Sequence, residues 1–410
     1  MILRGLGEYE PQKIFGWLLS IERRNGSLIG AKASMRLMIR FLQSLVFRRQ
    51  KLCRLFETKH PKIVFFISEV NIRKDLRDMV LDVADTIEKK HAEVIYANKS
   101  ITFSFKRLIE NFRCLGNWYR SLSSVYTTKN EALLLITYLF ICKDYLHYLQ
   151  YFIQEHDVRM LVVRYDAFFL DNFIVQFARN NKIVSATLQH GVMVARRESL
   201  SDRVDFSGLE FKYFTSDYFL AWNTFTKREA VKNGVDEKKV CVLGNAKCLS
   251  VEAFPYVNTG VFGVILDGKD TSENNERMVN LANSISTRMQ MKYRLRYHPA
   301  FRGDEYKCIT NENAIDDGIC KSSLEEFLKV HEFCIVSNST LLFEIPYYGR
   351  MYYRFSENRP DDKYIDLEEP CFNDFESFAN LYTSCSLNKK VYSSKKDREM
   401  YRNFFYHFIK

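Results

Sequence analysis

The sequence predicts an α/β protein made of two domains, each with a parallel sheet. From residue 60 onward, short apolar runs rich in Val and Ile alternate with longer segments that have the 3.6-residue period of helices. This alternation restarts after a looser stretch at 247–260, and 410 residues exceed what one hydrophobic core usually supports. We therefore expect two Rossmann-like domains facing a cleft, with a helical N-terminal extension and a C-terminal helix.

The first predicted domain spans residues 61–250 and follows the extension at 1–60. Its strands are expected at 62–68, 92–98, 158–166, 183–189, 218–222 and 239–244, and its helices at 72–91, 104–121, 129–155, 168–181 and 224–233. Several of these strands do not alternate polar and apolar residues, so helices should cover both faces of the sheet. The last helix ends at Asn-Gly, where Gly234 should adopt the left-handed conformation that stops helices.

The second predicted domain spans residues 251–394. Its strands are expected at 261–268, 292–299, 332–340 and 350–355, with helices at 273–291, 323–330 and 340–348. Residues 395–410 form a further amphipathic segment, which we expect to be a helix that crosses back to the first domain.

The charge of the chain is uneven. The 60 basic and 50 acidic residues give a net charge of +10, and residues 23–62 are dense in Arg and Lys with few acids. A basic amphipathic segment of this kind suits an anionic membrane surface or a polyanionic ligand, but a solvated helix pair packed on its apolar face is an equal alternative. Helix-turn-helix, zinc and RNP-like patterns are lacking, so nucleic acid is not an expected partner.

Targeting signals and cysteine pairs are not apparent. The N-terminal residues lack the apolar core of a secretory signal, and the apolar run at 132–142 stops at Lys143, short of the ~20 residues that span a bilayer. The ten cysteines include no C-x-x-C pair, which favours reduced thiols and no metal site. We expect a cytoplasmic protein, with the inner face of the cytoplasmic membrane as a candidate site of attachment through the basic segment.

The most informative short stretch is Gln189-His190-Gly191, directly after a predicted strand. Gly191 allows a tight exit from the strand, which would leave the His190 ring at the sheet edge. Imidazole titrates near neutrality and suits proton abstraction from a hydroxyl, whereas the alternative is a buried histidine bonded to a carbonyl. Asp166, at the end of the strand at 158–166, is a further polar candidate on this side.

A cationic edge is predicted in the second domain. In "RLRYHPA", Arg294, Arg296 and His298 share one face at period two, and Pro299 ends the strand. Such an edge suits phosphate. The alternative is a solvent-exposed edge strand with no ligand.

Two more stretches follow predicted strands of this domain. In "VSNSTLLFE", hydroxyl and amide side chains precede a predicted helix, and Glu344 lies one turn inside it. A helix N-terminus of this kind can bind an anion, although plain helix capping explains the same residues. The residues concerned are Ser337, Asn338, Ser339 and Thr340. In "LDGKD", Gly268 allows close backbone approach and Lys269 supplies charge, without the spacing of a phosphate-binding Walker motif.

The order of these stretches resembles a known group of enzymes. A His-Gly strand end, then "AWNTFTKREAVKNGVDEKKVCVLGNAK", then His-Pro and Ser-Asn-Ser-Thr with Glu, is similar to bacterial GT-B transferases of surface-polysaccharide assembly. The nearest groups are CDP-glycerol glycerophosphotransferases, polysialyltransferases, capsule Kdo-transferases and related capsule glycosyltransferases. The resemblance covers about residues 158–350, with "LQHGV" where the glycerophosphotransferases have Trp-His-Gly-Thr, and without the acidic-acidic-glycine motif of some sialyltransferases.

The resemblance implies a metal-independent transferase that needs no cofactor. A sugar or alditol phosphate would move from a nucleotide-activated donor to a polysaccharide or a lipid-linked acceptor. His190 would be the general base, with Gln189, Gly191 and Asp166 on the acceptor side. His298 and Arg296 would contact the donor phosphate together with Ser337, Asn338, Ser339, Thr340, Gly268 and Lys269, and Glu344 would bind the donor ribose.

Two other functions remain open at this point. A nucleotide-sugar 2-epimerase shares the two-domain architecture, and it would act on the sugar nucleotide without an acceptor. A non-catalytic protein that binds nucleotide or polysaccharide is the third hypothesis, and it would keep its cellular role after replacement of His190.

Overall fold

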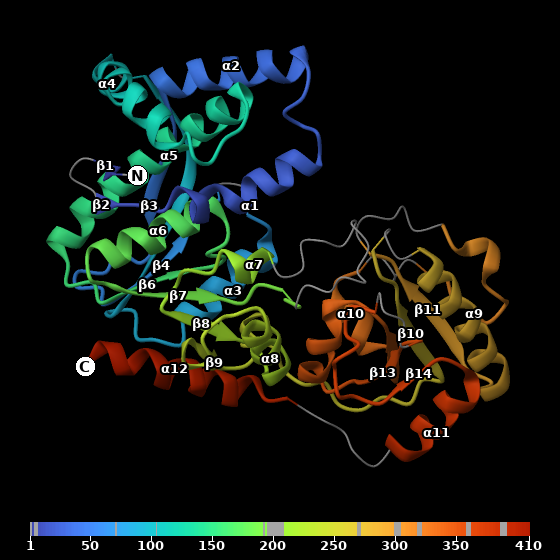
Figure 1. Ribbon diagram of the computed structural model, residues 1–410. Coiled ribbons are helices and arrows are strands. Elements are labelled where there is room, and N and C mark those ends of the chain that lie inside the picture. The colour runs from blue at the N-terminus through green and yellow to red at the C-terminus, as the bar shows by residue number, and fades with distance from the viewer. Residues whose placement is uncertain are drawn as a thin grey trace. The chain divides into compact units, whose positions relative to one another are not determined.

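The structure is a computed structural model. It describes residues 2–3, 7–69, 72–103, 105–191, 193–194, 209–268, 272–298, 305–317, 322–357, 362–385 and 392–410. The chain divides into two compact units (Figure 1). Unit 1 contains the described residues up to 194, those from 209 to Lys247, and Asp397–Lys410, whereas unit 2 contains those within Cys248–Lys396.

Unit 1 is built on a seven-stranded sheet. Its strands are β3 (Phe47–Arg54), β4 (Ile63–Ile67), β5 (Ala92–Phe103), β6 (Met160–Val163), β7 (Val184–Leu188), β8 (Tyr218–Ala221) and β9 (Val240–Val242), in the order β3-β5-β4-β6-β7-β8-β9. β3 runs antiparallel to β5, and every other neighbouring pair is parallel. A small hairpin, β1 (Ile2–Leu3) and β2 (Gly7–Glu8), lies outside this sheet.

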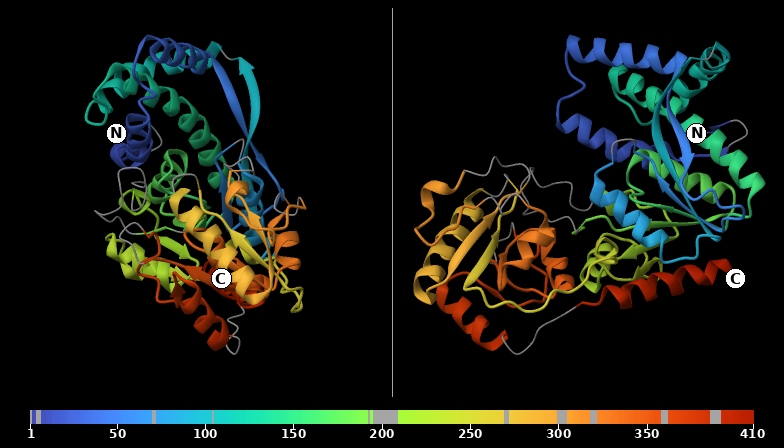
Figure 2. Two further views of the ribbon diagram at one scale, coloured as in Figure 1. Left: turned by 90° about the vertical axis from the view of Figure 1, so that its right-hand side faces the viewer. Right: turned by 180° about the vertical axis from the view of Figure 1, so that it is seen from behind.

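Helices of unit 1 connect these strands and cover the sheet (Figures 1 and 2). They are α1 (Pro11–Arg24), α2 (Ala31–Val46), α3 (Lys74–Ala84), α4 (Phe105–Ser121), α5 (Lys129–Glu155), α6 (Phe169–Asn180), α7 (Leu209–Lys212), α8 (Thr224–Lys232) and α12 (Ser394–Ile409), with 3₁₀ turns at Glu237–Lys239 and Ala246–Cys248. β4 and β6 are buried along their whole length, which explains why their sequences are apolar without alternation.

Unit 2 has a five-stranded, wholly parallel sheet in the order β11-β10-β12-β13-β14. The elements are β10 (Val261–Ile265), α9 (Ser272–Met289), β11 (Lys292–Arg296), α10 (Leu324–Lys329), β12 (Phe333–Val336), β13 (Met351–Phe355), β14 (Cys371–Phe372) and α11 (Phe375–Cys385), with 3₁₀ turns at Lys307–Ile309, Thr340–Phe343 and Ile345–Tyr348. The predicted class, an α/β protein with two Rossmann-like parallel sheets and a C-terminal helix, is therefore confirmed.

Each sheet has one point where the strand order reverses. In unit 1 the chain goes from β4 to β5 on one side and then returns to β6 on the other side. In unit 2 it goes from β10 to β11 and returns to β12. Ligands of open parallel sheets bind just beyond the carboxyl ends of the strands at such a point, because the loops there separate. These two strand pairs therefore indicate where to look for binding sites.

The long helix α5 (Lys129–Glu155) confirms the helix predicted at 129–155, which is longer than the apolar run inside it. The apolar run at 132–142 continues past Lys143 in a single helix of 27 residues, which begins with a capping box formed by Thr128 and Glu131. By length and composition this helix could cross a membrane. However, residues such as Leu135, Leu139 and Leu146 are buried in the core of unit 1, so the helix has the packing of a core helix.

Two further segments differ from the sequence prediction. The extension at 1–60 is helical in α1 and α2, but residues 47–54 form β3, which pairs with the unexpectedly long β5. The helix predicted at 340–348 consists of two 3₁₀ turns, since Pro346 has no N–H to continue an α-helix. The predicted α-helical N-terminus at Ser339 and Thr340 is therefore absent. Gly234, in contrast, has the predicted left-handed conformation, with φ of 86°.

The C-terminal helix α12 packs on unit 1 through a tight contact at Gly244. The Asp397 carboxylate accepts a hydrogen bond from the Asn245 N–H at 3.0 Å, and the Tyr401 hydroxyl donates to the Gly244 carbonyl at 3.2 Å. Gly244 has φ of 95°, and a Cβ there would lie 1.9 Å from Cγ of Asp397. Only glycine fits both the backbone conformation and the space.

Replacing Gly244 by alanine is expected to remove at least about 2 kcal/mol of stability and to lower the melting temperature by about 4–8 °C. Gly260→Ala is the matched control, because Gly260 also has a positive φ (65°) but a Cβ there would meet nothing within 4 Å. That control should show only the backbone strain, about 1 kcal/mol. Equal losses in thermal unfolding of the two variants would contradict the role of the Asp397 contact.

Candidate functional site

The first candidate site lies at the reversal point of unit 1. Arg164 follows β6 and is 7% exposed, and its Nη2 donates to Oε2 of Glu69, just after β4, at 2.8 Å. This ion pair joins the ends of the two strands between which the order reverses. His190 follows the next strand, β7, and its ring centroid lies 4.3 Å from that of Tyr165. We call Glu69, Arg164, Tyr165 and His190 the His190 cluster.

The side chain of His190 is half-buried, and its Nδ1 atom is buried and has no hydrogen-bond partner among the described residues. Burial of the ring nitrogens and, to a smaller extent, the positive charges of Arg164, Lys247 and Arg73 together lower the pKa of the ring to about 3. The imidazole is therefore neutral at physiological pH. A buried nitrogen without a partner costs free energy unless a ligand or water satisfies it, which favours a binding role for this ring.

Lys247 and Arg73 bring more positive charge toward the cluster. Lys247 follows β9, with its Nζ 3.5 Å from Oδ2 of Asp75 and 5.7 Å from the centroid of the Trp222 ring. Arg73 pairs with the same carboxylate at 2.6 Å. Three cationic side chains from three different loops thus act electrostatically on a neutral histidine, and they share the two carboxylates of Glu69 and Asp75, an arrangement that leaves positive charge for an anionic ligand.

The other residues predicted on this side have internal roles. Both amide hydrogens of Gln189 are donated within the protein, to the Gly191 carbonyl at 2.8 Å and to Oγ1 of Thr226 at 3.1 Å, and its Oε1 accepts from the Trp222 N–H. Gln189 therefore ties β7 to β8. A Cβ at Gly191 would meet nothing within 4 Å, and its φ is not positive, so the backbone does not require glycine there.

Asp166 is likewise engaged inside unit 1. Its Oδ2 accepts hydrogen bonds from the Thr215 N–H, the Ser216 N–H and the Ser216 hydroxyl at 2.8–2.9 Å. Burial raises its pKa to about 6, although these hydrogen bonds and Lys239 favour the charged form. The carboxylate holds the turn at 213–216, and this contact explains its position without a ligand.

The second candidate site lies at the reversal point of unit 2, between β10 and β12. Asp267 follows β10 and is buried, and its Oδ2 accepts from the Asn338 N–H and from Nδ2 of Asn274, both at 3.0 Å. Asn274 also donates to Oγ of Ser337 at 3.0 Å. Lys363 donates its backbone N–H to Oδ1 of Asn338 at 2.9 Å. We call Asp267, Asn274, Ser337 and Asn338 the Asp267 cluster.

One carboxylate oxygen of Asp267 is available as a hydrogen-bond acceptor. Its Oδ1 is buried and has no hydrogen-bond partner among the described residues. Burial raises the pKa of the carboxyl to about 6, while the hydrogen bonds and the charge of Lys363 act in the opposite direction. An oxygen of this kind is suited to accept a hydrogen bond from a hydroxyl group of a ligand, such as a ribose hydroxyl.

The basic residues predicted to bind the donor phosphate do not form one site. Arg296 donates to the Ser322 carbonyl at 2.9 Å and its guanidinium lies over the Phe327 ring, so it contacts α10 and the loop before it. Arg294 pairs with Asp317. His298 is exposed beyond the end of β11. The predicted cationic edge is therefore largely paired inside the unit.

The residues after β12 divide between the Asp267 cluster and the turn that follows. Ser337 and Asn338 belong to the cluster, whereas Ser339 caps the 3₁₀ turn by accepting from the Leu341 N–H at 3.3 Å. Thr340 begins this turn, and the half-buried Glu344 ends it. Gly268 directly follows Asp267, and Lys269 lies outside the described residues.

Several members of both clusters are not among the residues predicted from the sequence. Asp267 is part of the stretch "LDGKD", but only the neighbouring Gly268 and Lys269 were predicted as donor-binding residues. Arg164 and Tyr165 stand beside Asp166 in the same strand end. The available signal was the rule already applied to His190, namely that polar residues one to three positions after a buried parallel strand lie at the ligand-binding edge. Among the described residues, no group of His, Cys, Asp and Glu has the geometry of a metal site.

No protein-family model matches the sequence, and no curated protein matches it. Solved structures with a similar arrangement include the UDP-GlcNAc 2-epimerase of Neisseria meningitidis bound to UDP-GlcNAc, with a TM-score of 0.47 and 10% identity over 84% of this chain and 99% of that one. The UDP-GlcNAc 2-epimerase of Methanocaldococcus jannaschii has a TM-score of 0.47 and 13% identity over 84% and 99%. The lipopolysaccharide outer core galactosyltransferase WaaB has a TM-score of 0.42 and 12% identity over 85% and 99%.

Proposed function

We propose that the protein is a glycosyltransferase, or a glycerophosphotransferase-like enzyme, that uses a nucleotide-activated donor. The acceptor is a surface polysaccharide or a lipid-linked precursor. The observation that carries this proposal is that both sheets place at the reversal point a buried polar atom for which the described residues supply no partner, Nδ1 of His190 in unit 1 and Oδ1 of Asp267 in unit 2. Each is surrounded by groups suited to a phosphorylated or hydroxylated ligand.

In this proposal, unit 2 binds the nucleotide of the donor. Oδ1 of Asp267 accepts from a ribose hydroxyl, and the hydroxyl groups that follow β12 donate to the donor phosphates together with Lys363. His298, exposed beyond β11, is the remaining candidate for a phosphate contact in this unit. Glu344 is a second candidate for the hydrogen bond to the ribose, and replacing each carboxylate separately distinguishes it from Asp267.

Unit 1 binds the acceptor in this proposal. Nδ1 of His190 takes the proton of the attacking acceptor hydroxyl, while Arg164, Lys247 and Arg73 stabilise negative charge on a phosphate of the substrate. A bound phosphate would offset the charge of the three cations, and the pKa of His190 would then rise from its low value, although burial, the larger cause of the shift, would remain. The ring therefore becomes a stronger base when the anionic substrate is in place.

Nucleotide binding is the first test. In a thermal-shift series with CMP, CDP, UDP and GDP, we expect one nucleotide to raise the melting temperature. A ligand at 100 times its Kd adds about 2.7 kcal/mol of stability. Asp267→Asn should abolish this shift, because the amide keeps an oxygen for Asn338 and Asn274 but presents a donor where Oδ1 stood.

His190→Gln is the matched control and should keep the nucleotide shift, since His190 lies in unit 1. Glu344→Gln tests the second ribose candidate. A shift that survives Asp267→Asn but not Glu344→Gln would move the ribose contact to Glu344. No shift with any nucleotide would contradict the proposed function, and turnover of a sugar nucleotide without an acceptor would indicate an epimerase instead.

A further inference from the structure

Unit 1 exposes two apolar helix stripes that no described element covers. On α2, Met35, Met38, Ile39 and Leu42 follow one another at positions i, i+3, i+4 and i+7, and all are exposed, with Met35 at 65%. On α4, Phe105, Ile109, Phe112 and Tyr119 form a similar stripe, with Phe105 at 63%. Ile101 and Phe103 at the end of β5 are also exposed.

A different face of α2 packs against the rest of unit 1. Leu37, Phe41 and Leu45 are buried in the core of unit 1, and α2 lies against α5. α2 and α4 lie side by side at the same end of the unit (Figures 1 and 2). The exposed stripes are therefore additional to what folding requires, and an apolar surface of this extent marks an interaction site.

The charges of this surface identify its partner. α2 and α4 together carry seven basic side chains and one acid. The acid, Glu110, already pairs with Lys143 of α5 at 3.5 Å. Arg36, Arg40 and Arg113 are exposed on the same two helices as the apolar stripes. A second copy of this surface would bring cations against cations, so charge argues against self-association and favours a polyanionic apolar surface.

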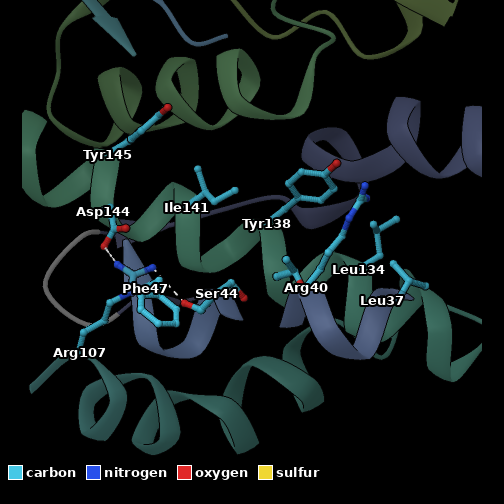
Figure 3. Close-up of a pocket in the computed structure, with 11 residues that line it drawn as sticks. Leu37, Arg40, Ser44, Phe47, Arg107, Leu134, Tyr138, Ile141, Asp144 and Tyr145 are labelled. Atoms are coloured by element: carbon cyan, nitrogen blue, oxygen red, sulfur yellow. Dashed lines mark hydrogen bonds and ion pairs between the residues drawn. The ribbon is translucent and has the colours of Figure 1, made fainter. Parts of the chain in front are cut away.

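A pocket beneath α2 also combines apolar side chains with an arginine. It lies between α2, α4 and α5, has a volume of about 190 Å³, and is lined by Leu37, Leu134, Tyr138 and Ile141 with Arg40 beside them (Figure 3). At its other end Arg107 forms an ion pair with Asp144 and donates to the Ser44 carbonyl. An apolar wall with a guanidinium beside it matches the chemistry of an acyl chain below an anionic headgroup.

We propose that the α2–α4 surface docks unit 1 on a bilayer that contains anionic lipids. Met35, Ile39, Phe105 and Phe112 enter the region between headgroups and acyl chains, and Arg36, Arg40 and Arg113 contact lipid phosphates. This inference is independent of the proposed reaction. It assigns to α2 and α4 the role of a membrane anchor, which in a transferase places unit 1 where lipid-linked acceptors are found.

The test is co-sedimentation of the full chain with vesicles of phosphatidylcholine alone or with 30% phosphatidylglycerol. We expect binding to the anionic vesicles only, with a loss of at least tenfold in the partition coefficient when salt rises from about 0.1 to 0.5 M, since the Debye length falls. Arg36→Glu with Arg113→Glu should lower binding at least tenfold, and so should Met35→Ser with Phe112→Ser.

The matched controls carry the same chemical changes elsewhere. Lys395→Glu with Lys396→Glu makes the same charge change on exposed side chains of α12, and Tyr256→Ser removes an exposed aromatic ring in unit 2. Both, and His190→Gln, should bind vesicles like the unchanged protein. Equal loss in Lys395→Glu with Lys396→Glu would show attraction by net charge alone and overturn the proposal. Absence of binding, with a dimer that Met35→Ser with Phe112→Ser dissociates, would show that the surface joins two copies.

Discussion

Replacing His190 by glutamine is expected to lower the turnover number by 10²–10⁴-fold, the usual contribution of a positioned general base. Glutamine has a similar reach and is neutral, as His190 is in the free protein, so the fold should tolerate it. It cannot accept the proton of an acceptor hydroxyl. The measurement is steady-state transfer with the nucleotide donor identified by thermal shift, together with the melting temperature of the variant.

The dependence of this activity on pH follows from the surroundings of the ring. In the free protein the pKa of His190 is lowered to about 3 by burial and nearby cations, so the base stays deprotonated as the pH falls from 8 to 5. kcat/KM, which reports the free enzyme, should therefore show no acid limb from this group in that range. With an anionic substrate bound the pKa rises, so kcat should decline at a higher pH than kcat/KM does.

Two outcomes would contradict the assignment of His190. One is a His190→Gln variant with unchanged kcat, which would leave the ring as a structural group. The other is an acid limb of kcat/KM near pH 6.5 that persists in the variant, because the group that titrates would then be a residue other than His190. His190→Asn, with a shorter side chain, checks that a loss does not depend on the bulk of glutamine.

Replacing Asp166 by alanine is expected to have the largest effect on stability, a loss on the order of 3–5 kcal/mol. The change removes the acceptor of three hydrogen bonds and leaves the buried N–H groups of Thr215 and Ser216 without partners. The turn at 213–216 should loosen as a result. Urea unfolding followed by circular dichroism measures the loss directly.

Asp166→Asn and Asp157→Ala are the companion variants. Asparagine retains an oxygen that accepts from the two N–H groups, so Asp166→Asn should fold even if the alanine variant does not. Asp157 is two-thirds exposed and its ion pair with Lys62 lies at the surface, so its removal should change stability little. If Asp166→Ala were as stable as the unchanged protein but failed to use acceptor, the role predicted from the sequence, on the acceptor side, would stand.

Much of the fold could be predicted from the sequence, because buried parallel strands and amphipathic helices leave local patterns. The six strands predicted in the first domain all exist, and α4, α5 and α12 begin and end within one residue of their predicted limits. Pairing over long distances is less visible. β3 was missed because residues 47–54 are mostly polar, and their strand conformation depends on β5, about 50 residues away.

The candidate sites were likewise predicted from the sequence only in part. The sequence by itself determined that His190 and the Ser337–Asn338 pair stand at the ends of buried parallel strands, since an apolar run followed by a polar residue is a local signal. Only the tertiary structure decided which of these groups have a partner. Gln189, Asp166 and Arg296 use their hydrogen bonds inside the protein, while His190 and Asp267 each keep a buried atom that forms no hydrogen bond within the part of the chain that the structure describes. The physical reason is that hydrogen bonding and charge depend on neighbours supplied by other strands and loops, and the order of residues along the chain does not specify those neighbours.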